Sequence, residues 1–167
     1  MTVTKRKLRS GDTLAINVVH PPLGEYSKDV AAFADIREEL LAGEMSEWLH
    51  TPFYIGEIDG QVAGSLACYT PRDTRDVGMV EFVQTAEKHR RKGVSSVLLE
   101  ALMERFESEG GLALYLSTVN PVAGIYYEKY GFRYHTGHGM QYVSPAAAGF
   151  EETYLAFDGP ARVRPAH

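Results

Sequence analysis

A short basic segment, residues 84–96, joins two strongly patterned stretches of the chain. The β-rich run before it predicts a strand over residues 77–85, and the run after it predicts a helix over residues 95–108. The apolar positions of this stretch share one helical face: Val94, Val97, Leu98, Ala101, Leu102 and Phe106. The chain must therefore fold so that a strand leads through a basic loop into a long helix.

The loop has the composition of an anion-binding site. Arg90, Arg91 and Lys92 supply three adjacent positive charges, and Gly93 lets the backbone approach a phosphate closely. The free N–H groups of a first helical turn, with the helix dipole behind them, bind anions. These features predict a pyrophosphate site, and a solvated basic turn that caps the helix is the alternative interpretation.

The composition favours one soluble domain. The 167 residues are 44% hydrophobic and 23% charged, and no run of about 18 apolar residues is present to span a membrane. Cys68 is the only cysteine, so an internal disulfide and a cysteine-based zinc site are excluded and the cytoplasm is the expected compartment. The basic N-terminus lacks a following apolar stretch, so no secretory signal is expected. A net charge of −5 argues against general nucleic-acid binding.

Turn and cap residues divide the rest of the chain into alternating elements. Asp59-Gly60 predicts a type I′ hairpin turn, and Asn120-Pro121 predicts a capped helix start. Residues 1–20 are interpreted as an edge strand or arm. Strands are predicted at 14–19, 53–58, 61–69, 77–85, 112–119, 132–135 and 151–157, and helices at 26–41, around 45–49, at 95–108 and at 121–130. This order indicates one α/β domain over residues 1–158, a mixed sheet with helices on both faces, and a flexible tail at 159–167.

Two motifs together resemble the GCN5-related N-acetyltransferase (GNAT) superfamily. The segment Arg90-Arg91-Lys92-Gly93-Val94-Ser95 is similar to its pyrophosphate loop, Arg/Gln-x-x-Gly-x-Gly/Ala, with Ser95 where Gly or Ala is usual. Asn120-Pro-Val-Ala123 and Tyr127-Glu-Lys-Tyr-Gly-Phe132 are similar to its second motif. The resemblance covers roughly residues 53–135. It implies a mostly antiparallel central sheet of six to seven strands.

The resemblance also implies acetyl-CoA as the donor and an amine of a small molecule or peptide as the acceptor. Residues 83–85 would pair with the pantetheine arm, the N–H groups of residues 91–96 would hold the pyrophosphate, and Asn120 would touch the pantetheine as well as cap its helix. The implied cofactor-binding residues are Val83, Gln84, Thr85, Arg90, Arg91, Lys92, Gly93, Val94, Ser95, Ser96, Asn120 and Tyr127.

Tyr127 is the general acid that the family motif indicates. A phenol with a pKa of about 10 can protonate a leaving thiolate, especially where a cation or dipole lowers its pKa. Periodicity does not separate Tyr127 from Tyr130, and Tyr126 is a further neighbour. A tyrosine packed in the core is the alternative role.

Glu81 is the candidate general base, because many relatives place an acidic residue or a water relay on this strand. Simple alternation places it on the same side as Val83 and Thr85. An exposed strand carboxylate and a water-mediated base are the alternatives that the sequence leaves open.

Three classes of function compete. The first is an N-acetyltransferase, the second a non-catalytic acyl-CoA-binding module, and the third nucleic-acid binding through residues 88–92. Residues 25–47 are acidic and would favour a cationic amine if they border the acceptor, although a solvated helix face is the favoured explanation of the same residues. No metal site is expected, because His89, His135 and His138 lack ligand spacing. No membrane or nucleic-acid partner is expected, and a homodimer is the candidate assembly.

Overall fold

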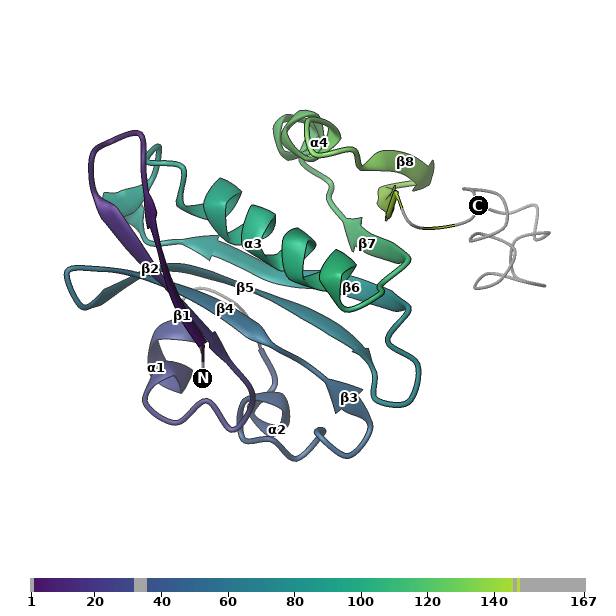
Figure 1. Cartoon of the computed structure of the whole chain (residues 1–167), viewed down its shortest axis with the longest axis horizontal. Helices are drawn as coiled ribbons and strands as arrows, with labels where there is room; N and C mark the ends of the chain where they lie inside the picture. Colours follow the sequence, from purple (N-terminus) through teal and green to yellow (C-terminus); the bar gives the residue numbers. More distant parts are fainter. Residues whose placement is uncertain (1, 32–35, 146, 148–167) are drawn as a thin grey trace.

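The computed structural model describes residues 2–31, 36–145 and 147 (Figure 1). These residues build a 9-stranded sheet with the order β1-β2-β4-β5-β6-β7-β9-β8, and β3 pairs with β5 beside this path. The strands are β1 Thr2–Lys7, β2 Thr13–Val19, β3 Leu49–His50, β4 Phe53–Ile58, β5 Gln61–Pro71, β6 Val77–Thr85, β7 Ala113–Ser117, β8 Arg133–Thr136 and β9 Gly139–Val143. All pairs are antiparallel except β6 and β7, which are parallel. The predicted mixed, mostly antiparallel sheet is therefore confirmed.

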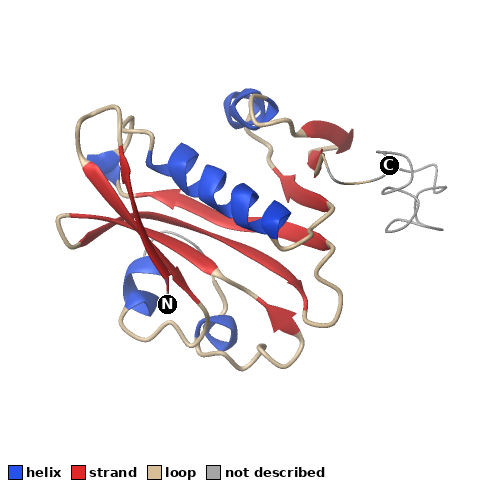
Figure 2. Ribbon diagram, in the orientation of Figure 1, coloured by secondary structure: helices blue, strands red, loops and turns tan. Residues whose placement is uncertain are grey.

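Helices cover both faces of the sheet, as the sequence predicted (Figure 2). The helices are α1 Tyr26–Ala31, α2 Glu38–Leu41, α3 Val94–Ser108 and α4 Pro121–Glu128, with a 3-10 turn, η1, at Glu87–His89. Side chains of β4 alternate between two apolar cores, since Tyr54 packs in the core under α3 whereas Phe53 and Ile55 pack against α1 and α2. The sheet thus separates an α3 face from an α1/α2 face.

A close approach at Gly64 sets the start of α3 directly on the sheet. A β-carbon at Gly64 would lie 2.7 Å from the carbonyl oxygen of Gln84 and 2.8 Å from Cγ1 of Val94. Only glycine leaves room for the first residue of α3 at this point of β5. The end of β6 and the beginning of α3 are therefore held against the same residue.

The strongest local signals of the sequence are confirmed. Asp59 and Gly60 have φ values of 52° and 78°, as a type I′ turn between β4 and β5 requires. Strand β6 has the predicted bounds, and α3 begins one residue before the prediction. Asn120 caps α4, its Oδ1 accepting the backbone N–H of Val122 at 3.0 Å.

The number of strands is larger than the predicted six to seven. Residues 1–20 form a hairpin of β1 and β2 where one arm or edge strand was predicted, and β9 was missed. β9 lies between β7 and β8 and reverses from β8 at Gly137, whose φ is 55°. Both missed strands belong to short hairpins whose turns lack the Asp-Gly signal.

Two helix predictions need correction. The helix predicted over residues 26–41 is interrupted, because Arg37 before α2 is extended, with φ −62° and ψ 133°. The helix predicted around residues 45–49 is wrong, since this segment makes turns and then forms β3. Pairing of Leu49 with Pro71 and of His50 with Thr70 outweighs the local helical pattern.

Several predictions fall outside the described residues. These are the strand at 151–157, the tail at 159–167, and the part of the first predicted helix at 32–35. The single domain over residues 1–158 extends into this region and stays a prediction. Within the described residues, no helix combines the length and the apolarity needed to cross a bilayer.

Candidate functional site

Strands β6 and β7 pair only at their beginnings and then separate. Val77, Gly78 and Met79 pair with Ala113, Leu114 and Tyr115, and the ladder ends there. Residues 80–85 of β6 continue without a partner from β7, and α3 and α4 follow the two strand ends. This leaves an open edge of backbone N–H and C=O groups, which can pair with an extended ligand.

A bulge in β6 changes which side chains share a face. Gln84 pairs with Ser65 and Glu81 with Ala67, so that Phe82 and Val83 stand opposite the single residue Leu66. Phe82 has a φ of 58°, and its ring stacks on Phe53 at a centroid distance of 6.3 Å. Packing thus holds a backbone conformation that bulky residues rarely adopt.

The bulge corrects the expected position of Glu81. Glu81 lies opposite Ala67 on the α1/α2 face, whereas Thr85 lies opposite Gly64 on the α3 face, so these side chains do not share a side. Glu81 is half-buried, and burial raises the pKa of its carboxyl. A raised pKa moves a carboxyl toward the range of a general base.

The loop after β6 presents unpaired backbone donors. Arg91 has a φ of 67° and Gly93, the N-cap of α3, a φ of 85°. Among the described residues, no group accepts a hydrogen bond from the N–H groups of residues 91–96. Apart from Lys92, these residues border a hollow of about 230 Å³ that Arg9, Thr85 and Arg90 also line. Convergent donors at the start of a 15-residue helix suit a phosphate or pyrophosphate.

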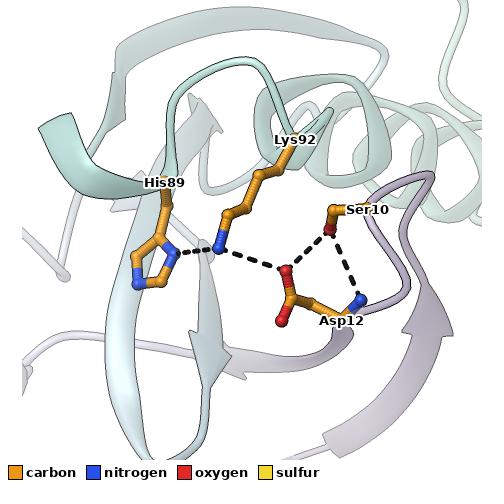
Figure 3. A network of polar contacts seen from close by, with 4 residues as sticks. All are labelled: Ser10, Asp12, His89 and Lys92. Atoms are coloured by element: carbon orange, nitrogen blue, oxygen red, sulfur yellow. Dashed lines mark hydrogen bonds and ion pairs between the residues drawn. The ribbon is translucent and has the colours of Figure 1, made fainter.

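The three predicted cations of the loop divide into two roles. The Lys92 ammonium lies 3.1 Å from Asp12 Oδ2 and 3.1 Å from His89 Nδ1, so it holds the loop against the turn between β1 and β2 (Figure 3). A hydrogen bond from Ser10, then the one from Lys92, lowers the pKa of Asp12 and keeps it charged. Arg90 and Arg91 are exposed and form no ion pair with another described residue. Two guanidinium groups thus remain for a ligand.

A second hollow, of about 450 Å³, continues from the loop to the end of β6. It is lined by Val83, Gln84, Thr85, Arg90 and Ser95. The hydroxyls of Thr85 and Ser95 lie 2.6 Å apart and tie the strand end to the helix start. The amide of Gln84 donates to the carbonyl oxygen of Val30 at 2.9 Å, which fixes α1 against the same strand end. The two hollows share Thr85, Arg90 and Ser95, so the structure brings the predicted residues of this segment, except Lys92, to two adjoining hollows.

Tyr127 comes from α4, on the far side of the opening. Its side chain is 9% exposed, and its ring packs edge-on against Tyr126 and Phe132. Its hydroxyl makes no hydrogen bond with a described residue. The oxygen is not fully buried, so it remains accessible. Burial raises the pKa of this phenol, and no cation lowers it. The phenol therefore stays protonated over the neutral range.

The neighbouring tyrosines have different surroundings. The Tyr130 hydroxyl donates to Glu100 at 3.2 Å, whereas the Tyr126 hydroxyl is buried and has no hydrogen-bond partner within the described part of the chain. Sequence periodicity could not make this distinction, because it depends on α3, which supplies Glu100. The fold and the loop thus define a protein that can hold a phosphorylated ligand at the ends of two separated strands.

The sequence matches the acetyltransferase (GNAT) family over residues 24–132. The chain therefore belongs to the GNAT family of acyltransferases, and the resemblance drawn from its motifs is confirmed. No curated protein matches the sequence.

Solved structures of this family share the fold at low identity. The GNAT domain of S. lividans PAT is 16% identical with a TM-score of 0.64, and the match covers 85% of this chain and 97% of that one. A GNAT acetyltransferase from Elizabethkingia anophelis with acetyl-CoA bound is 17% identical with a TM-score of 0.60, covering 78% and 98%. N-acetylglutamate synthase from Neisseria gonorrhoeae, in complex with CoA and L-arginine, is 19% identical with a TM-score of 0.62. That match covers 79% of this chain and only 33% of the synthase.

Proposed function

We propose that the protein is an N-acetyltransferase that moves the acetyl group of acetyl-CoA to a primary amine of a small molecule or protein. The observation that carries this proposal is the set of N–H groups at the start of α3 that donate to no described residue, next to the open edge of β6. Two similar proteins were solved with CoA or acetyl-CoA, which supports the choice of donor. The cytoplasm is the proposed location.

The described residues fit an acyl-CoA. The N–H groups of residues 91–96 would hold the pyrophosphate, with Arg90 and Arg91 adding charge and the Ser95 hydroxyl a further donor. Residues 83–85 would pair with the pantetheine amides, and Asn120 at the start of α4 would approach them from the other side of the opening. The thioester supplies the activated acetyl group, and the chain orients it and moves the protons.

Two side chains have the proposed proton-transfer roles. The attacking amine must lose a proton, which Glu81 accepts directly or through a water molecule. The leaving sulfur must gain a proton, which the protonated Tyr127 phenol donates. A new C–N bond then replaces the C–S bond, and the released products are an amide and CoA.

The acidic residues before β3 offer weak support for a cationic acceptor. Glu25, Asp29, Glu38, Glu39, Glu44 and Glu47 are exposed. Only Glu39 makes an ion pair among the described residues, 3.5 Å from Arg37. A solvated surface explains most of them.

The contacts of the loop lysines argue against nucleic-acid binding through residues 88–92. Lys92 is engaged by Asp12, and Lys88 donates to the side chain of Gln61 at 2.5 Å. The run of cations in residues 88–92 is thus not a continuous free patch, and the chain carries a net charge of −5.

The proposed function is tested by a calorimetric titration with acetyl-CoA and with free CoA, followed by a thiol-release assay over a panel of primary amines. We expect near one-to-one binding of both ligands and release of thiol that depends on the amine. Binding without release for any amine would favour the non-catalytic acyl-CoA-binding module. Absence of binding would overturn both interpretations.

Glu81→Gln is expected to lower kcat/KM by about 10²-fold at neutral pH and to change its pH profile. The base acts when deprotonated, and burial raises its pKa above the ordinary 4.5, so wild-type kcat/KM falls as the pH drops through the raised pKa. Glutamine does not titrate, so this fall of kcat/KM at low pH should be absent from the variant. Profiles measured between about pH 5 and 9 check it, with the exposed-loop change Asp73→Asn as the control. If kcat/KM of Glu81→Gln falls at low pH as that of the wild type does, the base is another group.

A further inference from the structure

A further cavity, distinct from the two hollows beside the loop, lies at the opposite end of α3. Its volume is about 320 Å³, within the range of small-molecule sites. Tyr54, Leu102 and Phe106 supply apolar walls, and His50, Thr70 and Arg75 supply polar groups. Nothing proposed above for the acyl donor or the acceptor uses these residues.

The cavity is separate from the candidate transferase site. Glu109, the C-cap of α3, borders the cavity, and Gly93, the N-cap, borders the anion-binding hollow. The rise of an α-helix places these two caps about 24 Å apart. Cys68 and Tyr54 belong to the core under α3, so the cavity opens on the α3 face, whereas Glu81 lies on the α1/α2 face.

One polar group at this cavity lacks a partner. Thr70 is 4% exposed, lines the cavity, and its Oγ1 makes no hydrogen bond with any described residue. A buried hydroxyl without a partner costs stability that a ligand group can recover. Thr70 pairs with His50 across β3 and β5, so both side chains rise from the same face of the sheet.

The cavity is bordered by one cation, Arg75, and one carboxylate, Glu109. Arg75 donates to Nε2 of His50 at 3.3 Å and forms no ion pair with a described carboxylate. The carboxylate of Glu109, which also borders the cavity, is paired with Arg105 at 3.1 Å. Burial first, and then the Arg75 charge, lower the pKa of His50 to about 4, so its ring is neutral. Arg75 is therefore the cation at this cavity that has no carboxylate partner among the described residues.

We propose that this cavity binds a small organic carboxylate, with its apolar body against Phe106 and Leu102 and its carboxylate between Arg75 and Thr70. A guanidinium with free N–H donors recognises a carboxylate with two hydrogen bonds. The Thr70 hydroxyl supplies a third donor. The proposal does not depend on the transferase function, since it uses neither the loop nor the open edge of β6.

The test is a ligand-observed NMR titration of the full chain with 3-phenylpropionate, cyclohexanecarboxylate and 4-methylpentanoate, each beside its neutral amide. We expect saturable binding of at least one acid, at least tenfold tighter than its amide, and unchanged binding in saturating CoA. Arg75→Gln should weaken the acid at least tenfold. Thr70→Val, which keeps the side-chain shape, should weaken it several-fold.

Arg133→Gln is the matched control, because Arg133 is exposed on β8 and does not line the cavity. It removes the same charge and should leave binding unchanged, and circular dichroism shows that each variant is folded. The proposal is overturned if none of the acids binds saturably, if acids and amides bind equally, if Arg75→Gln binds as the wild type does, or if CoA displaces the acid.

Discussion

Replacement of Gly93 by tryptophan is expected to weaken CoA binding by roughly a hundredfold or more, because two or more charge-assisted hydrogen bonds to the pyrophosphate are lost. Arg91 and residues 93–96 border a hollow beside Gly93, and a β-carbon placed on Gly93 meets no atom within 4 Å. An indole would therefore extend into the space where the phosphates are proposed to lie. Calorimetric titration of the folded variant with CoA measures the loss.

Gly110→Trp is the matched control for this variant. Gly110 has the same φ of 85°, equally open space around its β-carbon, and a position just beyond the other end of α3. Both variants carry the same left-handed strain, of about 1–2 kcal/mol, so a difference between them isolates the phosphate site. Gly93→Ala adds the strain without the bulk and should lose only a few-fold in affinity. Full CoA affinity in a folded Gly93→Trp protein would remove the loop from the proposed binding site.

The parts of the fold that could be predicted are those whose cause lies within a few residues. Asp59-Gly60 determines a turn because both positions take a positive φ, and Asn120-Pro121 starts a helix because the side chain caps it. Strand β6 and helix α3 follow in the same way from their periodicity. The prediction of a pyrophosphate loop at residues 90–95 rests on this local pattern together with the second motif.

The parts that could not be predicted depend on contacts distant in the sequence. The bulge at Phe82 has no glycine that would indicate a positive φ from the sequence. Stacking of its ring on Phe53 of β4 holds it in place. Strict alternation therefore placed Glu81 on the same side as Thr85, whereas the two side chains lie on opposite faces. Lys92 was predicted as a phosphate ligand from its charge and its place in the loop, but its ammonium forms an ion pair with Asp12, in the turn between β1 and β2. Such long-range pairing decides the roles of side chains whose type the sequence already indicates.

Replacement of Tyr127 by phenylalanine is expected to lower kcat by about 10²–10³-fold while CoA affinity changes by less than about twofold. The Tyr127 ring packs against Tyr126 and Phe132, and phenylalanine keeps these contacts. The variant loses only the accessible hydroxyl, which is the proposed proton donor to the leaving sulfur. Steady-state thiol release and calorimetric titration with CoA separate the two effects.

The pKa of Tyr127 adds a condition to this prediction. Burial raises the pKa above the ordinary 10.0, and an acid acts in its protonated form. The wild-type rate should therefore show no alkaline loss from this group until the pH rises through that raised pKa. A loss already present near pH 8 to 9 would point to a donor with a lower pKa.

Tyr134→Phe provides the control for the loss of a phenol beside α4. Tyr134 is half exposed on β8, and its hydroxyl lies where a β-carbon on Gly124 would be. Its replacement should leave kcat unchanged. Equal rates for Tyr127→Phe and the wild type would exclude Tyr127 as the acid. A joint loss of CoA affinity and kcat in Tyr127→Phe would instead mean that the tyrosine shapes the opening between β6 and β7 rather than transferring a proton.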